Sequence, residues 1–192
     1  MRKLKLLMHT SLDGFVTDQD GGMSWIKIDD TIFDYVDNKI IAGIGTALYG
    51  KVTYEMMEAY WPTAGDQPGA SDHSRRHAVW YRNVDKIVLS TTLKTNDKKV
   101  TVIAQDLVER IKKEKNKPGK DILIFGSPSA THSLLEHDLI DGFALFVNPV
   151  LLGKGVKLFD RIPALEKLKL VGMEKFESGV LYLNYEREKD GN

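Results

Sequence analysis

The 192-residue chain is 42% hydrophobic, which suits one domain with a sizeable core. Its 27 basic and 27 acidic residues cancel, so the chain offers no net positive field for nucleic acid or an anionic membrane surface. Without cysteine it has no disulfide, thiolate metal ligand or thiol nucleophile. We expect a single domain over residues 1–192 that is cytoplasmic and binds neither nucleic acid nor membrane.

Apolar runs alternate with amphipathic stretches along the chain, a pattern typical of a layered α/β domain. In the first half it predicts a strand at 4–8, a helix from 29 or 30 to 42, a strand at 46–49, a helix at 53–60, a loop at 61–69 and a helix at 71–82. Ser71 or Asp72 caps the last of these helices. The second half continues with strands at 86–90 and 100–103, a helix at 107–115, a buried strand at 122–125 with a helix after it, and strands at 142–150, 168–176 and 180–186. Residues 177–179 form the turn of a C-terminal hairpin.

The turn after the strand at 122–125 carries the strongest functional signal. Gly126 and Ser127 connect this strand to a helix that Pro128 opens, and proline suits a first helical position because its missing N–H has no intrahelical partner anyway. Unpaired backbone N–H groups and the positive end of the helix dipole then meet at one edge of the sheet, which favours a phosphate. Because glycine lets a ligand approach the main chain, we expect Gly126→Val to block that ligand by steric intrusion and to leave the fold largely intact.

Two further strand ends carry side chains suited to the same ligand. Lys51 and Thr53 follow the strand at 46–49, and the hydroxyls of residues 90–92 follow the strand at 86–90. In an open α/β sheet a ligand lies outside the carboxyl ends of the strands. The three strand ends together predict a dinucleotide site, with a diphosphate cradle and with a cation and hydroxyls for a phosphorylated ribose.

A nucleoside-triphosphate loop is the rival interpretation of the segment from Gly45 to Val52, which contains two glycines and Lys51 in the spacing of that motif. Val52 stands where the motif needs Ser or Thr to ligate magnesium, and the four residues between the glycines look like a strand instead of a loop. We therefore expect no such loop. An ATP-dependent enzyme is the alternative that magnesium-dependent ATP binding would favour.

The histidines give no prediction of a metal site. His73 and His77 lie four residues apart on a predicted helix but have no third ligand nearby, so we expect a solvated helix face. His9, at the end of a strand that should be buried, is expected to be a hydrogen-bonded core residue.

Trp25, Asp29 and Asp30 are the last candidates. A carboxylate at the start of a helix usually caps it, so both aspartates have a structural explanation. The functional alternative is a carboxylate that anchors a nitrogen heterocycle. A buried carboxylate there would have a raised pKa and could help to relay a proton.

Taken in order, five segments resemble the dihydrofolate reductase fold, in particular the reductase domain of the bifunctional riboflavin-pathway deaminase–reductase. The resemblance extends from residue 4 to about residue 185. Its segments are SLDG at 11–14, LYGKVTYE at 48–55, IVLS at 87–90, FGSPS at 125–129, and LIDG at 139–142 leading to NPVLLGKGVKLF at 148–159. The resemblance implies a three-layer αβα fold with a twisted mixed β-sheet and a C-terminal β-hairpin.

The same resemblance implies a reductase that transfers hydride from NADPH to a small pyrimidine- or pterin-like heterocycle. It implies a homodimer, for which a sheet edge near the C-terminus is a natural contact. The cofactor-binding residues that it implies are Thr10, Val16, Gly50, Lys51, Val52, Thr53, Ser90, Thr91, Gly126, Ser127, Pro128 and Ser129. The substrate-binding residues are Ser11, Trp25 and Asp29, and the catalytic residue is Asp30.

Two departures from the family pattern leave the cofactor preference and the substrate open. Lys51 stands where many relatives have arginine, which keeps the charge but loses the bidentate fork and softens the preference for NADPH over NADH. Gly142 stands where riboflavin-pathway enzymes usually have an acid, which weakens the prediction of a substrate such as 5-amino-6-(5-phosphoribosylamino)uracil. Dihydrofolate reductase activity and a non-catalytic nucleotide-binding module are the alternatives.

Overall fold

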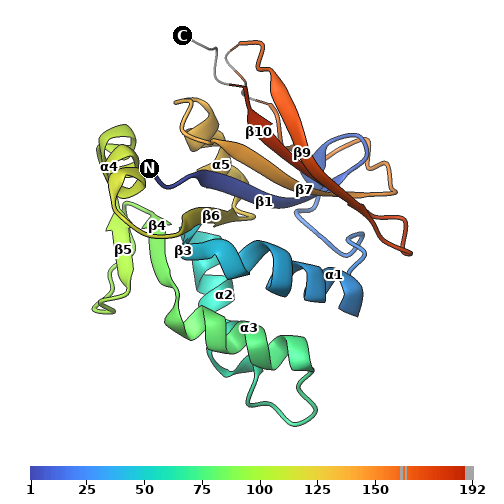
Figure 1. The fold of residues 1–192 in the computed structure, drawn as a ribbon, viewed down its shortest axis with the longest axis horizontal. Coiled ribbons are helices and arrows are strands. Elements are labelled where there is room, and N and C mark those ends of the chain that lie inside the picture. Colours follow the sequence, from blue (N-terminus) through green and yellow to red (C-terminus); the bar gives the residue numbers. More distant parts are fainter. Residues whose placement is uncertain (161, 163, 189–192) are drawn as a thin grey trace. The chain divides into compact units, whose positions relative to one another are not determined.

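The computed structural model describes residues 1–160, 162 and 164–188 (Figure 1). The chain divides into two units. The first unit consists of Met1–Arg2 and Ile28–Leu123, and the second consists of Lys3–Lys27 and the residues after Leu123. Each unit therefore draws on two separate stretches of the chain. The expectation of a single domain over residues 1–192 stays a prediction.

The first unit combines parallel strands with helices. Its elements are α1 (Asp30–Tyr35), η1 (Val36–Ile40), η2 (Ile41–Gly43), β3 (Ile44–Gly50), α2 (Lys51–Ala64), α3 (Asp72–Asn83), β4 (Asp85–Leu89), β5 (Val100–Ile103) and α4 (Leu107–Asn116). β4 lies between β3 and β5, and the three strands run parallel. Gly50 lies opposite Leu89, so β3 and β4 end at the same edge. The next strand, β6 (Asp121–Phe125), begins in the first unit and ends in the second.

The core of the first unit lies along β3 and β4, where consecutive residues at 46–50 and at 86–88 are buried, as expected of strands that are covered on both faces. Its most deeply buried strand residues are Ala47, Leu48, Tyr49, Ile87 and Val88. α2 and α3 pack against each other, and α3 also contacts α1 and η1 (Figure 1). Among the described residues, no helix is both long enough and apolar enough to cross a membrane.

The helix expected from 29 or 30 to 42 is interrupted. It begins at Asp30 as α1, changes at Val36 to the π-helical turn η1, and ends with a 3₁₀ turn that starts at Ile41. In a π-helical turn each hydrogen bond spans five residues, one more than in an α-helix. Such turns often occur at functional sites. The hydrophobic spacing alone does not reveal this change of pitch.

The helix expected at 53–60 is longer than predicted. α2 runs on through Pro62 to Ala64 and includes part of the segment that we expected to be a loop. Proline cannot donate the helical hydrogen bond, which is why the composition favoured a loop. The ring of Trp61, however, lies 4.0 Å from the ring of His77 on α3, and this packing stabilises the last turn of α2.

The second unit is built on a mixed sheet. Its remaining elements are β1 (Leu4–Ser11), β2 (Phe15–Thr17), α5 (Pro128–Leu135), β7 (Gly142–Asn148), β8 (Val156–Lys157), β9 (Leu168–Lys175) and β10 (Leu181–Arg187). β1 pairs with β7 in parallel, whereas β10 pairs with β7 and with β9 in antiparallel fashion. β9 and β10 form the predicted hairpin, closed by a hydrogen bond from Gly179 N to Phe176 O. The mixed α/β class, the mixed sheet and the C-terminal hairpin are confirmed.

A small antiparallel pair, β2 with β8, was not predicted. Its strands have only three and two residues, too few for an alternation of apolar and polar positions to be recognised. A Cβ added to Gly155, whose φ is 141°, would lie 1.9 Å from the carbonyl oxygen of Thr17. Glycine is therefore required where this loop approaches β2.

Candidate functional site

The carboxyl ends of β3 and β4 form the candidate site of the first unit. Gly50 ends β3 in an extended conformation and caps α2 without a side-chain hydrogen bond. The Nζ of Lys51, the first residue of α2, donates a hydrogen bond to Thr92 Oγ1 over 3.0 Å. The same Nζ lies 3.7 Å from Glu55 Oε1, one helical turn further on. The structure thus brings Lys51 to the loop after β4, where the predicted hydroxyls lie.

Ser90 shapes this loop. Its Oγ accepts hydrogen bonds from Thr92 N over 3.1 Å and from Leu93 N over 2.9 Å, which makes a side-chain-closed turn. Thr91 is exposed. Thr92, which was not among the predicted site residues, is the one that contacts Lys51. The run of three hydroxyls was the available signal, but the sequence does not say which of the three faces the lysine.

Val52 and Thr53 complete the predicted set in the first unit. The side chain of Val52 is 81% exposed, and Thr53 is half-buried. Both lie in the first turn of α2, whose N–H groups have no partner further back in the helix. Val52 can therefore serve an anion only through its backbone, whereas Thr53 also offers a hydroxyl.

The turn between β6 and α5 is the candidate site of the second unit. Gly126 and Ser127 both adopt the left-handed backbone conformation, each with a φ of 55°. Gly126 N donates to Leu7 O over 3.1 Å, and Thr131 Oγ1 donates to the Gly126 carbonyl over 3.2 Å. The Oγ of Ser127 donates to Phe125 O over 3.2 Å instead of capping α5. The turn is thus anchored on the strand side and on the helix side.

α5 begins without a side-chain cap. Pro128 has no N–H, so the first amide groups of the helix are those of Ser129 and Ala130. These groups and the helix dipole favour an anion. A Cβ at Gly126 would meet no atom within 4 Å among the described residues, so the turn is open on that side. These features fit the diphosphate of a dinucleotide.

The conformation of Gly126 adds a cost to the expected Gly126→Val variant. At a φ of 55° a side chain is strained even though the space around its Cβ is open. Valine, which is branched at Cβ, tolerates this conformation especially poorly. We therefore expect the variant to be destabilised, and the expectation that it blocks the ligand and leaves the fold largely intact stays a prediction.

Ser11 and Asp13 tie the end of β1 to the glycine-rich loop before β8. The buried Ser11 donates from Oγ to Asp13 Oδ1 over 2.6 Å and accepts from Phe15 N over 2.9 Å. The Asp13 carboxylate accepts from Leu152 N over 3.1 Å and from Gly153 N over 2.8 Å. The hydrogen bond from Ser11, with those from the backbone, lowers the pKa of Asp13 to about 2. These contacts give a physical reason for the SLDG and LLGKG segments to occur together.

Asn148 organises the same end of β1 and was not predicted as a site residue. It is fully buried between strand ends, and its Nδ2 donates to Thr10 O over 3.2 Å. Its Oδ1 accepts from Lys27 N over 2.9 Å, which fixes the chain just after Trp25. Its place at the start of the most specific motif was the only sequence signal for this role.

Val16 and Trp25 are the remaining predicted residues of the second unit. Val16 is buried in β2. Trp25 is half-buried in the loop after β2, with its Nε1 donating to Gly22 O over 3.2 Å. Thr10 and Ser11 lie in the same unit. The second unit therefore contains the residues predicted to bind the nicotinamide and two of the residues predicted to bind the substrate.

Asp29 and Asp30 lie in the first unit at the start of α1. The Oδ1 of Asp29 accepts from Ile32 N over 3.0 Å and from Thr31 Oγ1 over 2.6 Å, so Asp29 is the N-cap of the helix. Asp30 is exposed. The burial on which the proton-relay hypothesis depended is therefore absent at Asp30, and its catalytic role stays a prediction.

His9, His73 and His77 all lie against aromatic rings. His9 is half-buried, less than the core position that we predicted: its ring stacks on Phe146 with centroids 4.8 Å apart, and desolvation lowers its pKa to about 4. The prediction of a solvated face for His73 and His77 is wrong. Both are buried, and both face Asp37, which lies 36 residues before His73 in the chain.

The mixed sheet, the C-terminal hairpin and the helix that opens at Pro128 define a mixed α/β domain of the dihydrofolate reductase-like class. The family model described as the RibD C-terminal domain matches residues 2–182. The chain belongs to this family, which confirms the resemblance inferred from the five segments.

Two relatives from Bacillus subtilis (strain 168) match along nearly their whole length. YyaP is 29% identical over 189 residues, which cover 96% of this chain and 94% of YyaP. YwjB is also 29% identical over 189 residues, with 97% of this chain and 98% of YwjB covered. Neither name states an activity.

Solved structures share the fold. A pyrimidine reductase-like protein from Corynebacterium diphtheriae superposes with a TM-score of 0.67 at 16% identity. The match covers 98% of this chain and 93% of that protein. A diaminohydroxyphosphoribosylaminopyrimidine deaminase/5-amino-6-(5-phosphoribosylamino)uracil reductase from Thermotoga maritima gives a TM-score of 0.63 at 18% identity. The match covers 97% of this chain and 56% of the Thermotoga maritima protein.

Proposed function

We propose that this chain is an NADPH-dependent reductase that acts on a small pyrimidine- or pterin-like heterocycle. The observation that carries the proposal is the pair of left-handed residues, Gly126 and Ser127, leading into a helix that no side chain caps. Family membership supports the same conclusion, because a 5-amino-6-(5-phosphoribosylamino)uracil reductase shares the fold. The bound cofactor would supply the hydride, and the protein would supply binding and orientation.

In the second unit, the amides of Ser129 and Ala130 would bind the diphosphate. Their N–H groups and the dipole of α5 favour negative charge without any charged side chain. Gly126 allows the phosphate to approach the main chain. Thr10 and Val16 would contact the nicotinamide, and Ser11 and Trp25 the substrate side of the same unit.

In the first unit, Lys51 would supply the cation that distinguishes NADPH from NADH. Its Nζ is held between the hydroxyl of Thr92 and the carboxylate of Glu55. A ribose phosphate would bind this ammonium and the hydroxyls of Ser90 and Thr91. Because Lys51 is a point charge and Glu55 competes for it, we expect a preference for NADPH that is real but modest.

A matched pair of variants tests the diphosphate site. At the left-handed position of Ser127, both Asp and Asn are tolerated, so Ser127→Asp and Ser127→Asn differ in little except charge. In a fluorescence titration with NADPH we expect wild-type affinity to survive largely in the Asn variant and to fall at least about tenfold in the Asp variant. Equal affinity in the two variants would overturn the assignment of this turn.

A second pair tests the ribose phosphate. We expect Lys51→Ala to weaken NADPH binding by about tenfold, which is about 1.4 kcal/mol, and to leave NADH binding unchanged. Lys112→Ala, on the exposed face of α4, is the control and should change neither. A loss of magnesium-dependent ATP binding in Lys51→Ala, with NADPH ignored by the wild type, would favour the ATP-dependent alternative.

The substrate is to be found by screening reduced-nicotinamide oxidation against pyrimidines, pterins and dihydrofolate. Asp30 is the proposed proton donor, and Asp30→Asn should lower turnover without changing NADPH affinity. A non-catalytic nucleotide-binding module is favoured by one observation, namely that Asp30 is exposed and Asp29 is engaged as a helix cap. NADPH binding without oxidation on any member of the panel would select that alternative.

We further propose that the protein is a cytoplasmic homodimer that pairs through β9. β9 is the outer strand of its sheet, and it exposes Leu170, Val171 and Met173. An exposed apolar edge strand is a template for pairing with another chain. Light scattering behind a sizing column should give twice the monomer mass of 21.6 kDa. Met173→Lys should reduce that mass to the monomer value, whereas Met56→Lys, at an exposed methionine on α2, should not.

A further inference from the structure

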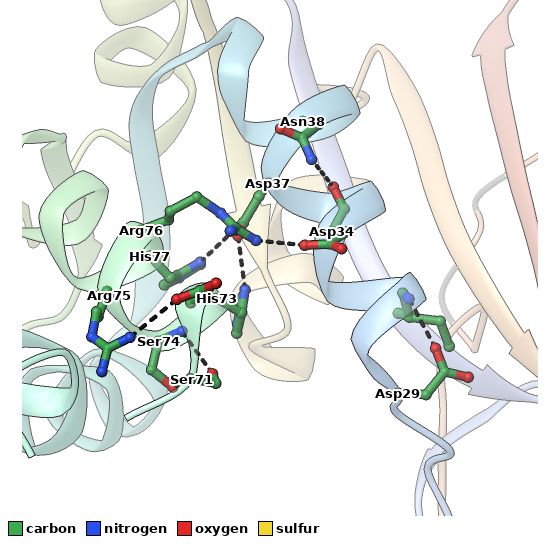
Figure 2. A network of polar contacts seen from close by, with 12 residues as sticks. Asp29, Asp34, Asp37, Asn38, Ser71, His73, Ser74, Arg75, Arg76 and His77 are labelled. Atoms are coloured by element: carbon green, nitrogen blue, oxygen red, sulfur yellow. Dashed lines mark hydrogen bonds and ion pairs between the residues drawn. The ribbon is translucent and has the colours of Figure 1, made fainter. Parts of the chain in front are cut away.

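Asp37, His73 and His77 form a buried cluster within the first unit (Figure 2). Asp37 lies in the π-helical turn η1, and the two histidines lie one turn apart on α3. His73 Nδ1 is 2.9 Å from Asp37 Oδ2, and His77 Nδ1 is 3.6 Å from Asp37 Oδ1. Both imidazoles thus present the same ring nitrogen to the two oxygens of one carboxylate.

Hydrogen bonding within the cluster leaves several of its atoms unused. The side chains of Asp37, His73 and His77 are 5%, 7% and 8% exposed. Among the described residues, Asp37 Oδ1, His77 Nδ1 and His73 Nε2 have no hydrogen-bond partner. Buried polar atoms are normally paired, so unpaired atoms that face each other call for an explanation. The single hydrogen bond between His73 and Asp37 accounts for only part of the cluster.

The spacing suits a small divalent cation. One ligand atom from each residue can be chosen so that all three lie within 4.8 Å of one another. Ligands about 2.0 Å from a tetrahedral zinc ion lie about 3.3 Å apart. The separations of 2.9 and 3.6 Å between the Nδ1 atoms and the carboxylate oxygens fall on either side of that value. The two distances run to different oxygens of the carboxylate, and the ligand nitrogens of the two imidazoles lie at most 4.8 Å apart, so side-chain rotations would bring the three ligand atoms together around an ion.

The surroundings resemble the outer shell of a metal site. Arg76 Nε donates to Asp37 Oδ2 over 3.2 Å, which orients the carboxylate and leaves Oδ1 facing His77. Metal-ligating carboxylates are commonly held by such hydrogen bonds. Phe33 stacks on His73 with centroids 3.9 Å apart, and Trp61 covers His77 at 4.0 Å. The aromatic rings fix the planes of both imidazoles.

We infer that Asp37, His73 and His77 form a site for a divalent transition-metal ion, zinc in the first instance, that joins η1 to α3. Two imidazoles and one carboxylate are ligands typical of zinc, cobalt and nickel, and they are less suited to calcium, which prefers oxygen. A water molecule would complete the tetrahedron. The site is independent of the proposed nucleotide-binding residues, none of which is a ligand.

The test uses the full chain, stripped of metal with a chelator and then dialysed. On titration with cobalt we expect one equivalent to bind and to give the intense visible absorption of a tetrahedral complex, which zinc then displaces. Zinc should also raise the unfolding temperature, because it binds only the folded arrangement. A wild-type protein with neither the cobalt band nor the shift in unfolding temperature would overturn the proposal.

Single substitutions identify the ligands. His73→Gln, His77→Gln and Asp37→Asn should each weaken zinc binding well beyond the roughly 10–100-fold that results from removing residues that only orient ligands. His137→Gln and Asp72→Asn, at exposed positions outside the cluster, are the matched controls and should bind zinc as the wild type does. Wild-type affinity in all three cluster variants would contradict the assignment. If a variant does not fold, the wild-type cobalt spectrum still decides between binding and its absence.

Discussion

The turn at Gly126 and the cluster at Asp37 concentrate polar groups in two different ways. The turn presents the backbone amides of Ser129 and Ala130, and its geometry results from the left-handed Gly126 and Ser127 and from Pro128 after them. The cluster is made of side chains from two helical segments, and Asp37 and His73 are 36 residues apart in the chain. A site of backbone groups depends on local conformation, whereas a site of side chains depends on how elements pack. The two should therefore respond to different perturbations.

The largest expected effect is the loss of stability in acid that results from His9. His9, in the second unit, has a pKa of about 4 in the folded protein against its ordinary value of 6.5. The unfolded chain therefore binds more protons between these values, so the free energy of unfolding falls as the pH drops from 6.5 to 4. The loss from His9 should be roughly 3 kcal/mol. Urea unfolding at a series of pH values measures it.

A substitution at His9 provides the control for this pH dependence. His9→Phe keeps the stacking on Phe146 but removes the titrating group, so it should flatten the fall in stability. An unchanged slope in that variant would show that His9 is not responsible.

The next prediction tests whether the left-handed backbone conformation at Gly126 stabilises the turn between β6 and α5. Gly126→Val should lower the free energy of unfolding by about 2 kcal/mol, because a β-branched residue is strained at a φ of 55°. Gly126→Asn should lower it by less than about 1 kcal/mol, because asparagine tolerates the left-handed region. Denaturant titrations of the two variants measure the difference. Equal losses would point to steric crowding, which the open space around this Cβ argues against.

The third prediction concerns side chains. With a chelator present, Asp37→Asn should lower the free energy of unfolding by about 1.5 kcal/mol, because the charged hydrogen bonds with His73 and Arg76 are lost. Asp72→Asn removes an exposed ion pair with Arg75 and should change it by less than about 0.5 kcal/mol. Thermal or denaturant unfolding distinguishes the two variants. If the cluster does not hold η1 against α3, Asp37→Asn and Asp72→Asn should lower the free energy of unfolding by the same small amount.

The smallest effect is expected at Ser127. Ser127→Gly removes the strain of a left-handed residue other than glycine, which is worth about 1 kcal/mol. It also increases the conformational entropy of the unfolded chain by a similar amount. The net change in unfolding free energy should lie within about 0.5 kcal/mol. A larger stabilisation would show that strain at this position is retained for binding.

The elements that the sequence predicted well are those with local determinants. α3 begins after Ser71, as its capping side chain indicated, and β5 has the predicted bounds. The turn at Gly126 was predicted for the same reason, since its glycine and proline act within four residues. β2 and β8 were missed because strands so short carry no periodic pattern, and the end of α2 was missed because Trp61 is stabilised by a contact with another helix.

The side-chain contacts were predicted less well. Lys51 was expected near hydroxyls after β4, but the choice of Thr92 over its neighbours depends on how Ser90 closes the loop. His73 and His77 were correctly placed one turn apart on a helix. Their burial comes from contacts with Asp37 in η1 and with the rings of Phe33 and Trp61, which lie on other elements and which no local pattern reveals.

The widened turn η1 has a consequence for how this region can change over evolutionary time. A π-helical turn is equivalent to an α-helix with one inserted residue, and each residue rotates the chain by about 100° around the helix axis. Deleting a single residue between 36 and 40 would restore regular pitch and turn the residues on its N-terminal side through that angle relative to those on its C-terminal side. The number of residues in η1 is therefore under the same constraint as the cluster itself. A homologue that is one residue shorter in η1 should also have replaced His73 and His77.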